Sequence, residues 1–134
     1  MFLNLLKPEA KQLFMEAAYS LAHADGQFAD EEKAMMAAYE KEMGVTFDLL
    51  QAPKDLHALM KKMAGTLAPQ EKKIAFFELV GLAMADGEYG TEERAAMKEL
   101  AASFGMAQDY DATCEKLLEE YLALQEKVTA AVLG

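Results

Sequence analysis

The stretch AHADGQFADEEKAMM, residues 22–36, returns as AMADGEYGTEERAAM at residues 83–97. Sliding the chain by 61 residues also lays Pro8 on Pro69 and Gly44 on Gly105. In both copies a helix-forming segment runs into Ala-Asp-Gly and is followed by a second helix-forming segment. The chain is therefore predicted to use one helix-turn-helix unit twice, as repeat one at residues 8–45 and repeat two at residues 69–106.

Composition sets the fold class. A chain of 134 residues with 53% apolar content is long enough for one core and too short for two ordinary domains. Helix-forming residues dominate, the three prolines are few, and no segment alternates as a strand does. We therefore predict a single all-α domain of two pseudo-symmetric repeats, closed by a long C-terminal helix at about residues 109–133.

The expected helices begin at a proline or a capping side chain and most end at a glycine. They run from Pro8 to the Asp25-Gly26 break, from Asp30 to Met43, from Pro53 to Gly65, from Pro69 to Ala85, from Thr91 to Gly105, and from Asp109 or Asp111 almost to the end. The side chains of Asp30 and Thr91 are predicted to cap their helices, and Gly26 and Gly87 to form left-handed turns.

Charge and cysteine content narrow the classes of partner. Thirteen basic and 23 acidic residues give a net charge of -10, and Arg94 is the single arginine. No basic stripe is present to neutralise phosphates, so the sequence argues against nucleic acid and anionic membranes and favours cations or basic protein surfaces. Because Cys114 is alone, an internal disulfide and a cysteine zinc site are excluded. We expect a reducing, cytoplasmic setting.

Two apolar segments need separate consideration. The segment IAFFELVGLAMA, residues 74–85, is shorter than the roughly 20 residues that a bilayer requires, so it predicts a buried central helix. The opening MFLNLLKPEA has no basic start and too short an apolar run for a secretion signal. Neither segment predicts membrane insertion.

The repeated phrase has the residues of a half calcium loop. Asp25 and Asp86 are each followed seven residues later by a glutamate, Glu32 and Glu93, which imitates the second half of an EF-hand. In both copies the first ligand position of such a loop would fall on leucine, which cannot ligate a cation. Ordinary EF-hands are therefore excluded, and each loop keeps at most two or three carboxylates.

Two explanations of the phrase remain open at this point. A carboxylate in the last turn of a helix opposes the helix dipole, at a cost of a few tenths to about 1 kcal/mol. Loop N–H groups that hydrogen-bond to Asp25 and Asp86 would offset that cost, and so would a cation shared with Glu32 and Glu93. These four residues are the candidate metal ligands. Oxygen ligands alone favour calcium or magnesium over zinc.

The paired Ala-x-Ala-Asp-Gly and Glu-Glu-Lys/Arg motifs resemble the tellurite-resistance TerB-like family over about residues 8–106. Related repeats occur in the N-terminal region of DjlA-type co-chaperones. The resemblance implies an all-helical cytoplasmic bacterial protein of stress response or tellurite resistance, working in larger protein complexes. It also implies divalent-metal binding, carried by position onto Asp25, Glu32, Asp86 and Glu93.

No catalytic group can be assembled at a recognisable spacing, so we predict that the protein is not an enzyme. Cys114 has no base placed beside it and is predicted to be a small buried thiol. His23 and His57 are predicted to lie at the surface. Most of the ten methionines fall on inward faces, with a methionine-lined groove as the alternative to core filling.

The C-terminal helix carries an apolar stripe with coiled-coil spacing, namely Leu117, Tyr121, Leu124, Val128 and Ala131. The stripe either covers the helical domain or forms a homodimer seam. We therefore predict a TerB-like stress-response module that binds a divalent cation weakly and binds protein partners. The alternative is a purely structural or adaptor helical protein with no metal site.

Overall fold

The described part of the chain, residues 1–24, 26, 28–85, 87 and 89–134, forms six α-helices and one short 3-10 helix in this computed structural model. In chain order the elements are η1 (Leu3–Leu5), α1 (Pro8–Ala22), α2 (Asp30–Met43), α3 (Leu56–Thr66), α4 (Pro69–Ala83), α5 (Thr91–Ser103) and α6 (Tyr110–Leu133). None of the described residues lies in a strand. The prediction of an all-α fold is therefore confirmed.

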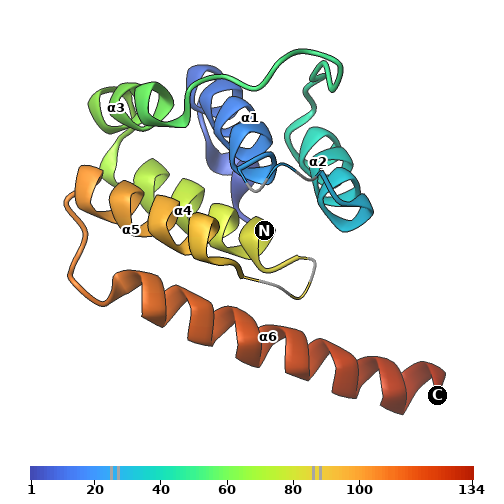
Figure 1. Cartoon of the computed structure of the whole chain (residues 1–134). Coiled ribbons are helices and arrows are strands. Elements are labelled where there is room, and N and C mark those ends of the chain that lie inside the picture. Colours follow the sequence, from blue (N-terminus) through green and yellow to red (C-terminus); the bar gives the residue numbers. More distant parts are fainter. Residues whose placement is uncertain (25, 27, 86, 88) are drawn as a thin grey trace.

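Helix α4 lies at the centre of the molecule (Figure 1). It packs against α1, α5 and α6, while α1 also contacts α2 and α3. Phe14 of α1 and Phe76 of α4 are completely buried and belong to one continuous core. The chain is thus a single compact domain, and the segment at residues 74–85 contributes the buried central helix that was predicted. Among the described residues, no helix is long and apolar enough to span a membrane.

Helix boundaries follow local sequence signals at most of the predicted positions. Pro8 and Pro69 occupy first helical positions, where a missing N–H costs nothing. Gly44 ends α2 in the left-handed conformation, at φ +68°. The prediction that α3 begins at Pro53 is wrong. Helix α3 begins at Leu56 because the carboxylate of Asp55 caps it by accepting a hydrogen bond from the backbone N–H of His57, at 3.1 Å.

The N-terminal segment is part of the core, which no sequence pattern predicted. Leu3 and Leu6 are buried, at 0% and 4% exposure. The backbone N–H of Leu3 donates to Glu42 of α2 at 2.8 Å. The amino group of Met1 donates to Glu78 of α4 at 2.7 Å. These contacts attach η1 to both α2 and α4.

Glu71 joins the start of α1 to the start of α4. Its two carboxylate oxygens accept hydrogen bonds from the backbone N–H groups of Lys7 and Ala68, each at 3.0 Å. Glu71 is buried. The hydrogen bond from Lys7, followed by the one from Ala68, holds the pKa of its carboxyl below the ordinary value of 4.5. The ionised carboxylate therefore stabilises the folded state.

We expect Glu71→Gln to lower the free energy of unfolding at neutral pH by about 1–2 kcal/mol, since hydrogen bonds to a charged acceptor are lost. A lowered folded-state pKa gives stability that is present above about pH 4.5 and is lost as pH falls through the folded-state value. The difference between wild type and variant should therefore shrink in acid. Urea unfolding across pH 3–7 measures this difference. At each pH, the linear dependence of the free energy of unfolding on urea concentration is extrapolated to zero urea.

Glu92→Gln is the matched control, because Glu92 is exposed in the first turn of α5. Its free energy of unfolding should stay within about 0.5 kcal/mol of wild type. A Glu71→Gln difference that stays constant down to pH 3 would contradict the assigned role of the ionised carboxylate.

Candidate functional site

The two repeated phrases form corners between helices. Gly26 follows α1 and Gly87 follows α4, and both adopt left-handed φ values, +80° and +82°. The predicted left-handed turns are therefore confirmed. Two of the candidate metal ligands, Asp25 and Asp86, lie outside the described residues.

The other two candidate ligands, Glu32 and Glu93, bind the backbone at the starts of α2 and α5. Both side chains are buried, at 2% and 4% exposure. Glu32 Oε1 accepts from the N–H of Ala29 at 3.0 Å, and Glu93 Oε1 accepts from the N–H of Gly90 at 3.3 Å. Each glutamate thus reaches back to the residue that precedes its helix, which is the glutamate half of a capping box. Capping is therefore one role of Glu32 and Glu93.

The predicted side-chain caps are wrong at both corners. The N-cap residues are Ala29 and Gly90, whereas Asp30 and Thr91 are already the first residues of their helices. Alanine and glycine have no side-chain acceptor, so the backbone N–H at the cap is satisfied by the glutamate three residues later. The sequence signal for this capping was a glutamate three residues after the N-cap position, Glu32 after Ala29 and Glu93 after Gly90.

A cation site is not assembled by the described residues alone. Among residues 1–24, 26, 28–85, 87 and 89–134, no group of three or more His, Cys, Asp or Glu side chains is arranged to hold a metal ion. Asp25 and Asp86 do not belong to that set, so the four-residue metal site stays a prediction.

The second corner is tied to α6 by the single arginine. The guanidinium of Arg94 lies 4.2 Å from the centre of the Tyr89 ring, its Nε donates to the Tyr89 carbonyl at 3.0 Å, and it is paired with Glu115 of α6 at 3.0 Å. Burial, followed by the charge of Glu115, raises the pKa of Tyr89 to about 12. The phenol therefore stays neutral, and the cluster positions α6 beside α5.

The remaining reactive side chains occupy structural positions. His23 is half-buried between the rings of Tyr19 and Phe28, with its Nδ1 2.7 Å from the Tyr19 carbonyl oxygen, so its predicted surface position is wrong. His57 is exposed, as predicted, and pairs with Glu99 at 2.6 Å. Cys114 is buried as predicted, at 1% exposure.

Burial raises the pKa of the Cys114 thiol. This is the opposite of the shift that activates a cysteine nucleophile, because the thiolate is the reactive form. The described surroundings of Cys114 therefore give it no nucleophilic activation.

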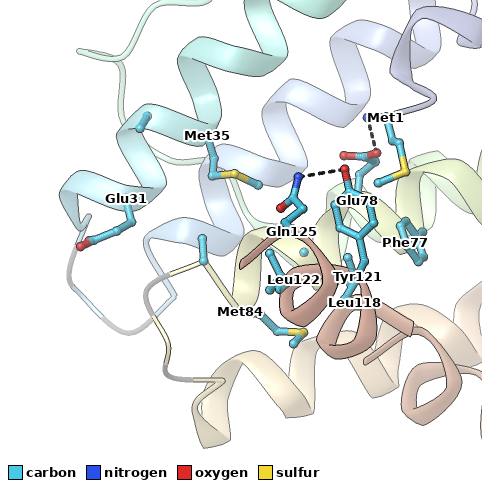
Figure 2. Close-up of a pocket in the computed structure, with 13 residues that line it drawn as sticks. Met1, Glu31, Met35, Phe77, Glu78, Met84, Leu118, Tyr121, Leu122 and Gln125 are labelled. Atoms are coloured by element: carbon cyan, nitrogen blue, oxygen red, sulfur yellow. Dashed lines mark hydrogen bonds and ion pairs between the residues drawn. The ribbon is translucent and has the colours of Figure 1, made fainter. Parts of the chain in front are cut away.

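An apolar groove of about 500 Å³ opens between α2, α4 and α6 (Figure 2). Its apolar lining includes Met35, Phe77, Gly81, Met84, Leu118 and Leu122. Gly81 leaves space in the α4 surface, and the two methyl groups of Leu118 lie 3.7 and 3.9 Å from the position that a Cβ would occupy there. Glu31 lies at the groove and is exposed.

The methionines divide between core and groove. Met15, Met60, Met63 and Met97 are buried, which confirms the predicted core filling for these four. Met35 and Met84 are half-buried and line the groove instead. The sequence signal for the groove was limited to the abundance of methionine, because its walls come from helices distant in the chain.

Comparisons of the chain with family models, with curated proteins and with solved structures find no match. The TerB-like resemblance stays a prediction that rests on the repeated phrase. The described features of the candidate site are two backbone-capping glutamates and a methionine-lined apolar groove.

We expect Glu32→Ala and Glu93→Ala each to lower the free energy of unfolding by about 0.5–2 kcal/mol, because a partly buried N-cap N–H loses its acceptor. Chemical unfolding in the presence of a chelator measures the effect without any cation. Glu31→Ala and Glu92→Ala are matched controls at exposed neighbouring positions and should change little. A loss that vanishes in the chelator would contradict the capping role.

Proposed function

We propose that this chain is a non-enzymatic protein-interaction module whose groove between α2, α4 and α6 binds an amphipathic helix of a protein partner. The observation that supports this most is the groove itself, an open apolar surface in an otherwise well-packed helical domain. Its volume of about 500 Å³ is within the range of about 300–1,000 Å³ typical of binding pockets. An apolar groove between helices suits the apolar face of a partner helix.

The lining of the groove favours an adaptable apolar contact. Met35 and Met84 have flexible, polarisable side chains that adjust to different apolar partners. Phe77 and Leu122 add larger apolar surfaces beside them. Figure 2 shows Met35 and Leu122 around the space between α2 and α6. A partner helix that places two or three aliphatic side chains in the groove would remove this apolar surface from water.

Charge favours a basic flank on the partner helix. The chain has a net charge of -10, and Glu31, whose exposed carboxylate points away from the groove in Figure 2, is an acidic residue at its edge. Complementary charge speeds association and selects against acidic partners. The proposed ligand is therefore an amphipathic helix with an apolar face and lysine or arginine at its edges.

A designed leucine-lysine helical peptide is the probe for this proposal. We expect fluorescence anisotropy to show saturable binding to wild type and about tenfold weaker binding to Met35→Glu, because a charge then lies in the apolar groove. If the peptide bound by electrostatic attraction alone, Met35→Glu would bind it more tightly than wild type, since the substitution adds a negative charge. Binding that is unchanged or stronger in Met35→Glu would contradict the groove as the binding site.

Leu50→Glu is the matched control, because Leu50 is 95% exposed and lies outside the groove. It adds the same charge and should leave the affinity for the peptide unchanged. A leucine-glutamate peptide should bind neither protein measurably, since it removes the charge complementarity.

The sequence resemblance supports a second activity, the weak binding of a divalent cation in a TerB-like stress-response protein. Its proposed ligands are Asp25 with Glu32 and Asp86 with Glu93, and oxygen ligands favour calcium or magnesium. The supporting observation is that the same acidic spacing occurs twice in the chain. Because few carboxylates are available in each loop, the affinity is expected to be weak.

We expect calcium or magnesium to raise the unfolding midpoint of chelator-treated wild type, and Asp25→Asn/Asp86→Asn to remove the rise. A ligand bound to the folded state alone adds about 2.7 kcal/mol of stability at a hundredfold excess over Kd. Thermal unfolding with calcium, magnesium, manganese and zinc measures the shifts. No shift in wild type at millimolar ion concentration would leave the corners as capping structures within a purely structural or adaptor protein.

A further inference from the structure

The second half of α6 is a helix without tertiary cover. Every residue from 119 to 134 is exposed, and α6 extends past the other helices (Figure 1). Of the eleven large apolar side chains that are exposed in the described residues, seven lie on α6. An isolated helix of about 12–15 residues is marginal in water. This segment therefore gains stability from anything that covers its apolar side.

The exposed apolar side chains form a stripe beside the face that packs on the domain. Cys114 and Leu118 face inward and are buried. The stripe consists of Leu117, Tyr121, Leu124 and Val128, which are 51%, 41%, 59% and 53% exposed. Their spacing of four, three and four residues follows the a and d positions of a coiled coil. Three of them, Tyr121, Leu124 and Val128, line one shallow depression along the helix.

We propose that a second copy of this chain covers the stripe, with the two α6 helices packed antiparallel. Because such a dimer has two-fold symmetry, each contact between two positions of the helices occurs twice. Tyr121 lies opposite Leu124 of the second copy, and Val128 lies opposite Leu117 of the second copy. The apolar layers thus match over the whole stripe in a single register.

The charges beside the stripe select the antiparallel arrangement. In this register the exposed Glu120 lies opposite Lys127 of the second copy, and the symmetry produces the same pair again. A parallel arrangement would instead place Glu120 beside Gln125 and Lys127 beside Val132, where neither charge gains a partner. The sequence of α6 is therefore complementary to itself in the antiparallel direction.

The available apolar surface predicts a weak dimer. The four stripe side chains are each about half exposed and together offer on the order of 200 Å² of apolar surface in each copy. Standard interfaces bury about 800 Å² per partner. The dimer should therefore be weak and form toward the millimolar end of the protein concentration range. Leu124 and Val128 lie outside the groove between α2, α4 and α6, so this interface goes beyond the proposed partner-binding function.

Charge reversal tests the direction of the helices. Sedimentation equilibrium from micromolar to millimolar protein should show a monomer-dimer equilibrium in wild type. Glu120→Lys and Lys127→Glu should each raise the dimer Kd about tenfold, since two flanking pairs become repulsive. The double variant Glu120→Lys/Lys127→Glu restores both pairs and should return Kd to within about threefold of wild type. A double variant as weak as the single variants would overturn the antiparallel register.

Leu124→Glu tests the apolar seam itself and should raise Kd at least about a hundredfold, because two carboxylates would be buried in its centre. Leu50→Glu is the control, and circular dichroism verifies that both variants keep their helix content. A wild-type protein that stays monomeric at millimolar concentration, or a dimer that Leu124→Glu leaves unchanged, would overturn the proposal.

Discussion

The packing of α1 against α4 is the contact on which the rest of the molecule depends. Phe14 and Phe76, one from each helix, are fully buried in the single core. The other elements attach to this pair: α2 and α3 to α1, α5 and α6 to α4, and η1 to both α2 and α4. Helix α4 is covered on several sides, which agrees with its sequence from Ile74 onward being apolar except for Glu78.

Buried glutamates make specific connections in this acidic protein. Glu32, Glu71 and Glu93 each accept a hydrogen bond from the backbone N–H that precedes a helix. Such bonds, aided by the positive end of the helix dipole, offset the cost of removing a carboxylate from water. Glu32 and Glu93, two of the four candidate cation ligands, therefore also serve local structure. The two roles are compatible, since a carboxylate has two oxygens and several acceptor positions.

Two apolar surfaces remain outside the core, and they differ in kind. The groove between α2, α4 and α6 is concave and lined by flexible methionine side chains, which suits a partner helix of variable sequence. The stripe on α6 is a narrow, regularly spaced ridge with fixed charges beside it, which suits one defined helix. Tyr121 borders both surfaces, so occupation of one is positioned to influence the other.

The sequence by itself determined the helices, because prolines, glycines and apolar spacing act within a few residues. It predicted α2 from Asp30 to Met43 and the left-handed turns at Gly26 and Gly87. It did not reveal that Glu32 and Glu93 replace the expected caps, because the same residues allowed either capping by the side chains of Asp30 and Thr91 or capping by the two glutamates. Only the tertiary structure decided that Met35 and Met84 border one groove, and that α6 is half covered and half exposed. Both depend on how distant helices pack, which local patterns do not encode.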